Sequence, residues 1–386
     1  MVNVFVPQEI RAGESRVAAT PETVKHMREA GLEVVVEKGA GAGAHYADEA
    51  YEKAGATLTG ERRAALAAAD LVLCVTSPEL EEAGALKEGA LLVGLLAPHH
   101  NLDLVRRLAE RRVSSFAMEL VPRTTRAQDM DALSSQASIA GYKAVLLAAA
   151  RLDKYFPLLM TAAGTIKPAR VVVMGAGVAG LQALATAKRL GAVVEVSDVR
   201  EVVKEQVESL GGKFIELPER QETGEGEGGY AREMTPEFLA AQRAIVARHV
   251  AGADVVVCTA LVPGKKAPLL VARDMVEAMR PGAVVVDLAV TQGGNCELSR
   301  ADEEVVHRGV VILGPSNLPA ATPLDASQLY ARNVWALVRI TLKEGAVALD
   351  LDDEIVAGTL LTHGGEVRHE PTRALLASGP VEGGKA

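Results

Sequence analysis

The chain has 386 residues, of which 49% are hydrophobic and only 3% aromatic, and its formal net charge is −9. This length is too great for one typical hydrophobic core and predicts two domains. The acidic balance disfavours nucleic acid and anionic lipid as partners, because binding to phosphates depends on clustered Lys and Arg. No apolar run approaches the roughly 20 residues of a transmembrane helix, and the N-terminus lacks a signal-peptide pattern, so we expect a soluble chain without direct membrane insertion.

The first 120 residues alternate short apolar runs with helical patterns. The expected strands lie at residues 2–6, 32–37, 71–75, 90–96 and 114–120. After the first strand, Thr20 is expected to cap a helix, Pro21 to occupy its first turn and Gly31 to end it. Repeated β-α units built mainly from Ala, Val and Leu predict a parallel sheet covered by helices.

Helical spacing then runs from Ser134 to about residue 160, and a second β-α series follows it. Its expected strands lie at residues 169–175, 192–198, 213–217, 254–260, 283–289 and 310–314. A second long helix is expected at residues 324–345, and the alternation around Gly364 and Gly365 predicts a hairpin. The sequence therefore predicts an α/β fold of two Rossmann-like, doubly wound parallel-sheet domains, joined by long helices, with a cleft between them.

The two long helices also suggest where the domains divide. We expect residues 1–133 together with about 325–386 to form a discontinuous N-terminal domain, and residues 134–324 to form the second domain. Within the second domain, residues 218–238 are rich in glutamate and glycine and poor in aliphatic residues. Such a segment cannot bury itself, so we expect a mobile loop, which is either a solvated insertion or, through Tyr230, a cover over a bound ligand.

The strongest single motif consists of Gly175, Gly177 and Gly180, directly between a buried-strand pattern and an Ala-rich helix. Gly175 would permit a tight turn, Gly177 the approach of a pyrophosphate, and Gly180 close packing of helix on strand. Asp198 ends the second strand, at the distance that a dinucleotide site requires. The motif therefore predicts dinucleotide binding, and the alternative is a glycine-rich turn without a cofactor.

Asp198 favours NAD(H) as that dinucleotide. A carboxylate at this position can accept hydrogen bonds from both hydroxyls of the adenine ribose. It would repel the 2′-phosphate of NADP by roughly 4 kcal/mol at about 4 Å and an effective dielectric of about 20. Arg200 is a residue type that an NADP site uses, but we treat it as secondary because Asp198 holds the strand-end position.

A polar stretch at residues 121–145 concentrates Arg, Gln, Asp and Ser in a chain that is otherwise rich in Ala, Val and Leu. A helix cap at Asp131 or Ser134 would explain one or two of these groups and leave the others without a reason. A general acid is harder to find, because only His99 and His100 among the eight histidines lie at the end of an expected strand. Paired histidines there are more often the solvent-exposed end of a strand than catalysts.

The three cysteines, Cys74, Cys258 and Cys296, are far apart in the sequence. They lack the Cys/His spacing of a metal site, so we expect no metal ion. We expect buried, reduced thiols in a cytoplasmic protein.

The opening residues VPQEIRAGESRVAATPETVKHMREAGLEVVVEKGAGAG resemble the alanine dehydrogenase and nicotinamide nucleotide transhydrogenase superfamily. The resemblance extends over nearly the whole chain and includes the glycine loop. Alanine dehydrogenases carry a substrate lysine in a strand and a histidine that closes the next strand. Here Cys74 and Thr76 stand at the lysine positions and Ala97 at the histidine position, although Arg16 is kept. The resemblance therefore favours the transhydrogenase branch, in which hydride passes directly between nucleotides and no carbonyl is protonated.

The resemblance also implies roles for individual residues. Arg123, Gln128 and Asp131 match the loop that lies beside the nicotinamide ring, and Ser134 follows it; these four are the expected catalytic group. Arg126 lies outside the match, and we expect it to be structural. Together with the glycine loop and Asp198, cofactor contacts are expected at Val178, Val199, Arg200, Gly229, Tyr230, Ala231 and Leu261.

As a whole, the resemblance implies an NAD(H)-binding subunit of a proton-translocating transhydrogenase that passes hydride to NADP⁺ on a partner. It would be a homodimer in the cytoplasm, held peripherally at the membrane by membrane-embedded and NADP(H)-binding partner subunits. Two alternatives stay open. One is an amino-acid dehydrogenase similar to alanine dehydrogenase, with His99 or His100 as its base, and the other is an NAD(H)-sensing module that passes no hydride.

Overall fold

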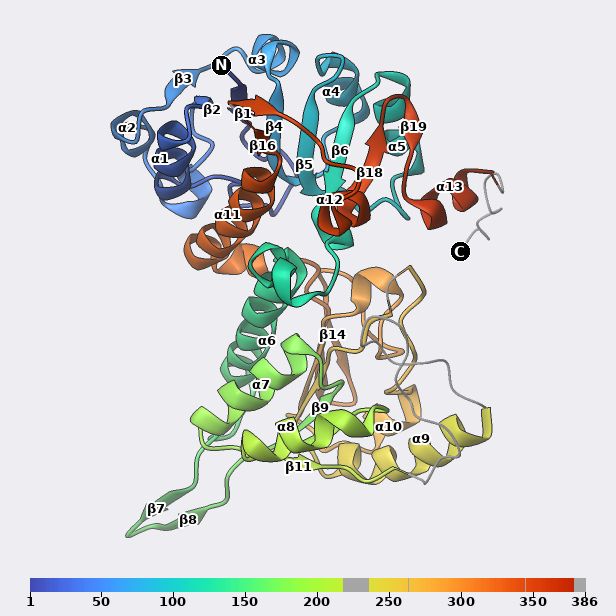
Figure 1. Ribbon diagram of the computed structural model, residues 1–386. Helices are drawn as coiled ribbons and strands as arrows, with labels where there is room; N and C mark the ends of the chain where they lie inside the picture. Colours follow the sequence, from blue (N-terminus) through green and yellow to red (C-terminus); the bar gives the residue numbers. More distant parts are fainter. Residues whose placement is uncertain (218–235, 263, 344, 378–386) are drawn as a thin grey trace. The chain divides into compact units, whose positions relative to one another are not determined.

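The computed structural model describes residues 1–217, 236–262, 264–343 and 345–377, and the chain forms two compact units (Figure 1). Unit 1 comprises Met1–Gln136 and Ala320–Ala386, and unit 2 comprises Ala137–Pro319. One boundary falls inside helix α6 (Ala132–Arg151), and the other falls just before helix α11 (Pro323–Ile340).

Unit 1 is built on an eight-stranded sheet in the order β19-β18-β6-β5-β4-β1-β2-β3. Its strands are β1 (Asn3–Val6), β2 (Glu33–Glu37), β3 (Thr57–Thr59), β4 (Leu71–Thr76), β5 (Leu91–Leu95), β6 (Ser114–Ala117), β18 (Leu360–His363) and β19 (Glu366–Val367). The first six strands are parallel and follow the 3-2-1-4-5-6 order of doubly wound nucleotide-binding folds. The expected C-terminal hairpin is confirmed, and its first strand joins the sheet antiparallel to β6.

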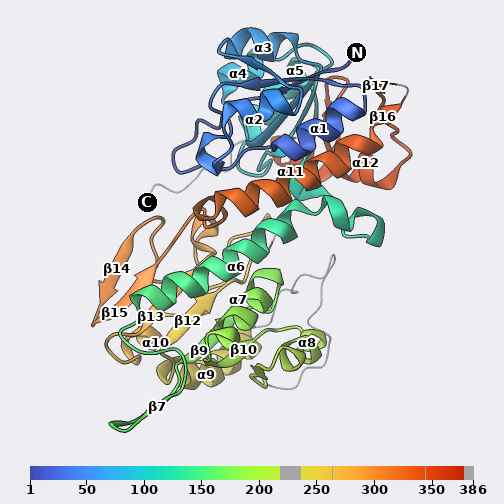
Figure 2. The same cartoon turned by 90° about the vertical axis from the view of Figure 1, so that its left-hand side faces the viewer.

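Helices cover both faces of this sheet. They are α1 (Pro21–Glu29), α2 (Asp48–Lys53), α3 (Arg62–Ala68), α4 (Leu80–Ala85), α5 (Leu102–Glu110), α11, α12 (Glu354–Thr359) and α13 (Glu370–Ala377). The expected ends of α1 are confirmed, because the Thr20 hydroxyl accepts a hydrogen bond from the Thr23 amide and Gly31 has φ +83°. Helices α1 and α11 lie side by side over one face (Figure 2), where Val4 and Val6 belong to the buried core.

Unit 2 contains a seven-stranded sheet in the order β11-β10-β9-β12-β13-β15-β14. The strands are β9 (Arg170–Met174), β10 (Val193–Ser197), β11 (Lys213–Phe214), β12 (Val255–Cys258), β13 (Val284–Asp287), β14 (Glu304–His307) and β15 (Val310–Leu313). The helices include α7 (Val178–Arg189), α8 (Lys204–Ser209), α9 (Pro236–Ala251) and α10 (Arg273–Glu277). All strand pairs are parallel except β14 with β15, so the expectation of two doubly wound parallel sheets is confirmed.

Four details differ from the expectation. Helix α11 ends at Ile340 rather than at residue 345, and a short antiparallel pair of β16 (Leu342–Lys343) and β17 (Ala346–Val347) follows it. Helix α6 ends at Arg151 rather than near residue 160, and a hairpin of β7 (Leu159–Thr161) and β8 (Gly164–Ile166) follows. Pro157 prevents a helix from extending through the expected end near residue 160. Strands β3 and β14 were not expected from the sequence. Residues 236–238 of the expected loop lie in α9, which begins at Pro236, and residues 218–235 lie outside the described chain.

Cys74, Cys258 and Cys296 are free and buried, as expected. Among the described residues, no helix combines the length and apolar character that a membrane crossing demands.

Helix α11 is held against the sheet of unit 1 by Tyr330, whose side chain is completely buried. The Tyr330 hydroxyl donates a hydrogen bond to the Cys74 carbonyl at 2.8 Å. This carbonyl lies where the register of β4 against β5 shifts, between Leu73 and Thr76. The hydroxyl therefore pairs a buried backbone acceptor at an irregular point of the sheet.

Replacing Tyr330 with phenylalanine should lower the free energy of unfolding by about 1–3 kcal/mol, because the Cys74 carbonyl would lose a buried partner. Urea denaturation followed by circular dichroism measures this change. Tyr155→Phe is the control, since Tyr155 is 57% exposed, and it should change stability by less than about 0.5 kcal/mol. Equal losses in the two variants would show that the buried hydrogen bond does not stabilise the unit.

Candidate functional site

The glycine motif forms the turn between β9 and α7 in unit 2. Gly175 has φ +103°, and a Cβ atom on Gly180 would lie 1.8 Å from the Gly175 carbonyl oxygen. A Cβ atom on Gly177 would meet nothing within 4 Å. Two of the glycines are therefore required by the fold, whereas Gly177 leaves open space in front of the backbone.

Helix α7 begins directly after this open space. Its N-cap residue is Gly177, which provides no side-chain cap, and the first helical residue, Val178, is 41% exposed. The first amides of a 12-residue helix carry partial positive charge and have no intrahelical partners. The space and the donors together fit a pyrophosphate group.

Asp198 follows β10 and is 8% exposed. Its carboxylate accepts a hydrogen bond from the Ala176 amide at 2.7 Å, which ties it to the glycine turn. It also accepts bonds from the Arg200 amide at 2.8 Å, from Nε at 3.0 Å and from Nη2 at 2.9 Å. Because a carboxylate has about four acceptor positions, ribose hydroxyls can bind Asp198 only if the Arg200 guanidinium moves aside.

Two of the remaining expected cofactor contacts lie in the described part of the chain. Val199 is half-buried beside Asp198, and Leu261, in the segment after β12, is 37% exposed. Gly229, Tyr230 and Ala231 lie outside the described residues.

In unit 1, the loop of Arg123, Gln128 and Asp131 contains the 3-10 helix η3 (Thr125–Met130), whose side chains point in two directions. Ala127 and Met130 are buried in the core of unit 1, whereas Arg123 and Gln128 are exposed. Among the residues that the structure describes, the Gln128 amide group has no hydrogen-bond partner. Its donor and acceptor are therefore both available to a ligand.

Asp131 and Ser134 form a cap at the start of α6. Ser134 donates its amide to Asp131 Oδ1 at 2.9 Å and its hydroxyl to Oδ2 at 2.5 Å. Capping therefore explains these two residues and does not explain Gln128. Arg126, expected to be structural, pairs with Asp353 at the start of α12 and thereby lowers the pKa of that carboxyl.

Two half-buried carboxylates, neither of which the sequence singles out, close the ends of β4 and β5. Glu9 accepts hydrogen bonds from the amides of Val75 and Thr76 at 2.5 and 3.2 Å and from the Thr76 hydroxyl. Glu119 accepts from the amides of Leu96, at 3.2 Å, and Ala97. Burial raises the pKa of both carboxyls, and these hydrogen bonds oppose the rise.

Arg16 is only 6% exposed and is committed to neighbours within unit 1. Its guanidinium donates to the two Glu14 carboxylate oxygens at 2.8 and 2.6 Å and to Gln136 Oε1 at 2.9 Å. The sequence showed that this arginine of the alanine dehydrogenase pattern is present here, but not that it is buried against Glu14 and Gln136. Polar residues on the apolar helices α6 and α11 were the only signal of such contacts.

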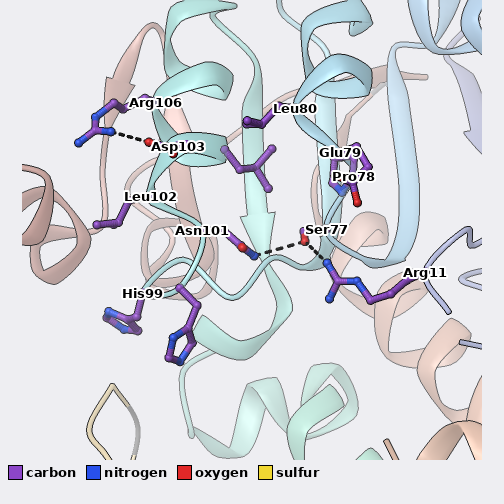
Figure 3. A pocket seen from close by; sticks show the side chains of 12 residues that line it. Arg11, Ser77, Pro78, Glu79, Leu80, His99, Asn101, Leu102, Asp103 and Arg106 are labelled. Atoms are coloured by element: carbon purple, nitrogen blue, oxygen red, sulfur yellow. Dashed lines mark hydrogen bonds and ion pairs between the residues drawn. The ribbon is translucent and has the colours of Figure 1, made fainter. Parts of the chain in front are cut away.

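His99 and His100 line a pocket of about 440 Å³ beyond β5, together with Arg11, Ser77 and Asn101 (Figure 3). Arg11 and Asn101 both donate to the Ser77 hydroxyl oxygen, at 3.0 and 3.3 Å.

The His99 ring packs edge-to-face on the His369 ring, with the centroids 5.8 Å apart. Burial lowers the pKa of His99, and the neighbouring His100 adds to this. His99 is therefore neutral near pH 7, and no carboxylate in the described chain hydrogen-bonds to its ring, so it lacks the orienting partner of a general base.

Family comparisons agree with this arrangement. The model for the N-terminal domain of alanine dehydrogenase/PNT matches residues 5–140, and the model for the C-terminal domain of the same family matches residues 144–370. Together the two matches span almost all of both units.

Individual relatives come from both branches of this family. The first part of the NAD(P) transhydrogenase alpha subunit from Rhodospirillum rubrum is 47% identical over 376 residues, which cover 95% of this chain and 98% of the relative. The alanine dehydrogenase of Bacillus subtilis is 30% identical over 376 residues, covering 95% of this chain and 93% of that protein. A crystal structure of transhydrogenase from Sinorhizobium meliloti superimposes with a TM-score of 0.85 and 45% identity, covering 95% of this chain and 99% of the other.

The glycine turn generates a paired prediction. Gly180→Ala should lower the unfolding temperature by several degrees, because the new Cβ would clash with the Gly175 carbonyl. Gly177→Ala should leave the unfolding temperature unchanged but weaken dinucleotide binding about tenfold or more, because its methyl group enters the open space. Thermal denaturation and fluorescence titration with NADH separate the two effects. Equal dinucleotide affinity in Gly177→Ala and the unmodified chain would contradict the assignment of this space.

Proposed function

The chain belongs to the alanine dehydrogenase/PNT family, and from that premise we propose that it is the NAD(H)-binding subunit of a proton-translocating NAD(P) transhydrogenase. Its high identity to transhydrogenase subunits makes it an enzyme subunit of the NAD(P) transhydrogenase type. The more specific proposal is that hydride passes directly between NADH on this chain and NADP⁺ on a partner, and that membrane subunits couple this transfer to proton movement.

The observation that carries this proposal is the hydrogen bonding of Arg16 and of Thr76 and Ala97 at the ends of β4 and β5. A dehydrogenase that reduces a keto acid needs a cation for the carboxylate and an acid for the carbonyl. Here the Arg16 guanidinium is committed to Glu14 and Gln136. Thr76 and Ala97, at the positions of the expected lysine and histidine, are bonded to the half-buried carboxylates of Glu9 and Glu119. Direct hydride transfer between nucleotides needs neither group.

The role assigned to this chain is to position the nicotinamide ring of its bound nucleotide. Hydride transfer depends on the distance and angle between the two nicotinamide C4 atoms, and the bound dihydronicotinamide supplies the hydride itself. We propose that Arg123 and Asp131 hold the carboxamide and ribose of the nucleotide. Gln128, which has both a donor and an acceptor, would touch the ring or the incoming NADP⁺.

The binding of the adenine half is proposed to involve the glycine turn and Asp198. The Arg200 guanidinium donates to both Asp198 carboxylate oxygens, at 3.0 and 2.9 Å. When NAD(H) binds, ribose hydroxyls would replace the two guanidinium bonds while the Ala176 amide bond remains. The Asp198 carboxylate supports NAD(H) as the ligand of unit 2, because it can accept a bond from a 2′-hydroxyl and would repel a 2′-phosphate.

We further propose a homodimer, and the β7–β8 hairpin that projects from unit 2 supports it (Figure 1). Leu158, Met160 and Ile166 in and beside this hairpin are 54%, 72% and 41% exposed. A two-stranded hairpin on its own is marginally stable in water, and exposed apolar groups of this kind mark protein contacts. A second copy of the chain would cover them.

The partner subunits belong to the same proposal. The Rhodospirillum rubrum relative is named as only the first part of an alpha subunit, which supports a complex of several polypeptides. We propose that the partners carry the NADP(H) site and the membrane-embedded proton path. This chain would then be cytoplasmic and would associate with the membrane peripherally, through those partners.

Reconstitution tests the proposed function. The chain is mixed with an NADP(H)-binding transhydrogenase subunit, NADPH and an NAD⁺ analogue, and reduction of the analogue is followed by absorbance. Gln128→Ala should lower this turnover at least about tenfold but change the Kd for NADH less than about threefold, because the side chain acts on ring geometry. Arg126→Ala, in the same 3-10 helix, is the matched control and should retain turnover.

The outcomes separate the alternatives. Pyruvate- and ammonium-dependent oxidation of NADH by the chain alone would identify an amino-acid dehydrogenase. Tight NADH binding without partner-dependent turnover would identify a sensing module.

Nucleotide preference provides a second test. We expect NADH to bind at least about tenfold more tightly than NADPH in equilibrium dialysis, because the 2′-phosphate would lie beside the Asp198 carboxylate. Asp198→Ala should weaken NADH binding and reduce this ratio. Asp274→Ala, which removes an exposed carboxylate from the same unit, should change neither. Equal affinities for the two nucleotides in the unmodified chain would refute the assignment.

A further inference from the structure

A chain of hydrogen bonds inside unit 1 connects the buried Arg16 to the backbone of the Gln128 loop. Arg16 Nη1 donates to Gln136 Oε1 at 2.9 Å, and Gln136 Nε2 donates to the Ser135 hydroxyl oxygen at 3.2 Å. The Ser135 hydroxyl lies 2.7 Å from Asn333 Oδ1, and Asn333 Nδ2 donates to the Asp129 carbonyl at 2.8 Å. This series of hydrogen bonds therefore ends at Asp129, one residue after Gln128.

Every link can run in the same donor-to-acceptor direction, starting from a permanently charged guanidinium. Hydrogen bonds that run head to tail polarise one another and are strengthened. Gln136 and Asn333 are only 6% and 8% exposed, so water competes little with them. Gln136 Nε2 also donates to the Ala326 carbonyl at 3.1 Å, which holds α6 against α11.

Asn333 is the residue at which this series of hydrogen bonds reaches the loop. Its side chain uses its acceptor toward α6, through Ser135, and its donor toward η3, through Asp129. The apolar side chains of Ala127 and Met130 anchor the same 3-10 helix in the core of unit 1. Their packing is non-directional and does not by itself fix the rotation of the helix. The hydrogen bond to the Asp129 carbonyl does so, because it is directional.

We propose that Asn333 is a positioning residue for hydride transfer: it fixes the backbone beside Gln128 and thereby the direction of the Gln128 side chain. This inference rests on the proposed transhydrogenase function for its effect on turnover, but not for its effect on the loop. Asn333 touches neither reacting nucleotide in this account and acts through the Asp129 carbonyl. Since misplacement by about 1 Å can cost a hundredfold in rate, a loosened loop should slow the chemical step.

The test uses the full chain with its NADP(H)-binding partner. Asn333→Ala should lower partner-dependent turnover at least about tenfold, with the Kd for NADH changed less than about threefold. The deuterium isotope effect with NADH labelled at C4 should rise, because hydride transfer becomes more rate-limiting. Ser135→Ala, which leaves the Asn333 to Asp129 bond in place, should show the same pattern with a smaller loss.

Gln328→Ala is the matched control, because Gln328 lies on the same helix and its only side-chain hydrogen bond in the described chain is an exposed one to Glu22. It should retain turnover and isotope effect. A loss of turnover in Asn333→Ala that merely follows a loss of folded protein or of NADH affinity, with an unchanged isotope effect, would overturn the proposal.

Hydrogen exchange provides a readout that does not depend on the proposed function. Mass spectrometry of the unmodified chain and of Asn333→Ala should show faster exchange of amides in residues 124–131 of the variant, with the strands of unit 1 unchanged. Faster loop exchange without any partner-dependent turnover in the unmodified chain would reject the transhydrogenase function and retain only the role of Asn333 in ordering the loop. Unchanged loop exchange would reject the positioning role, whatever the activity.

Discussion

The buried ion pair between Arg16 and Glu14 is the interaction on which the organisation of unit 1 depends. The Arg16 and Glu14 side chains are 6% and 0% exposed and lie 2.6 Å apart. Removing one partner of such a pair leaves an uncompensated buried charge and costs about 3–5 kcal/mol. The pair belongs to the segment between β1 and α1, yet through Gln136 it also fixes the start of α6. One electrostatic contact thus joins the first β-α connection to the helix that follows the polar loop, and no substrate is needed to explain why this arginine is kept.

The first five strands of each sheet follow the same order, 3-2-1-4-5, but the sheets differ at the point where that order reverses, which is where doubly wound folds bind their ligands. In unit 2 the turn after the first strand is the glycine turn, which leads into α7 with open space in front of Gly177. In unit 1 the corresponding turn contributes Glu9, whose carboxylate takes the amides of Val75 and Thr76 at the end of β4. The space beside Glu9 is only about 20 Å³, room for a single water molecule. The first sheet therefore has a carboxylate where the second has the glycine turn, and the dinucleotide site is proposed in the second.

Local signals in the sequence were sufficient for most of the fold. Thr20, Gly31, Gly175 and Gly180 act through neighbours a few residues away, and their turns and caps were predictable from spacing alone. The sequence did not predict the edge strands β3 and β14, because pairing decides their structure more than their own short patterns do. The contacts around the polar loop were even harder to predict from the sequence. Gln136 and Asn333 meet partners 120 and 204 residues away, and although polar residues on apolar helices suggest buried contacts, a single sequence does not identify the distant partner.

Within the polar stretch at residues 121–145, structural and functional roles are not exclusive. Asp131 caps α6 through Ser134, but each of its carboxylate oxygens accepts only one of these two bonds and keeps an acceptor position. A carboxylate that is already held by a cap has little rotational freedom to lose when a ligand binds, so capping lowers the entropic cost of a contact. Gln128 would also have little freedom to lose, because Asn333 is bonded to the neighbouring Asp129 carbonyl. The Gln128 side chain itself is exposed. On the proposed function, the stretch needs many polar residues because one set immobilises the loop and the other set positions a nicotinamide ring.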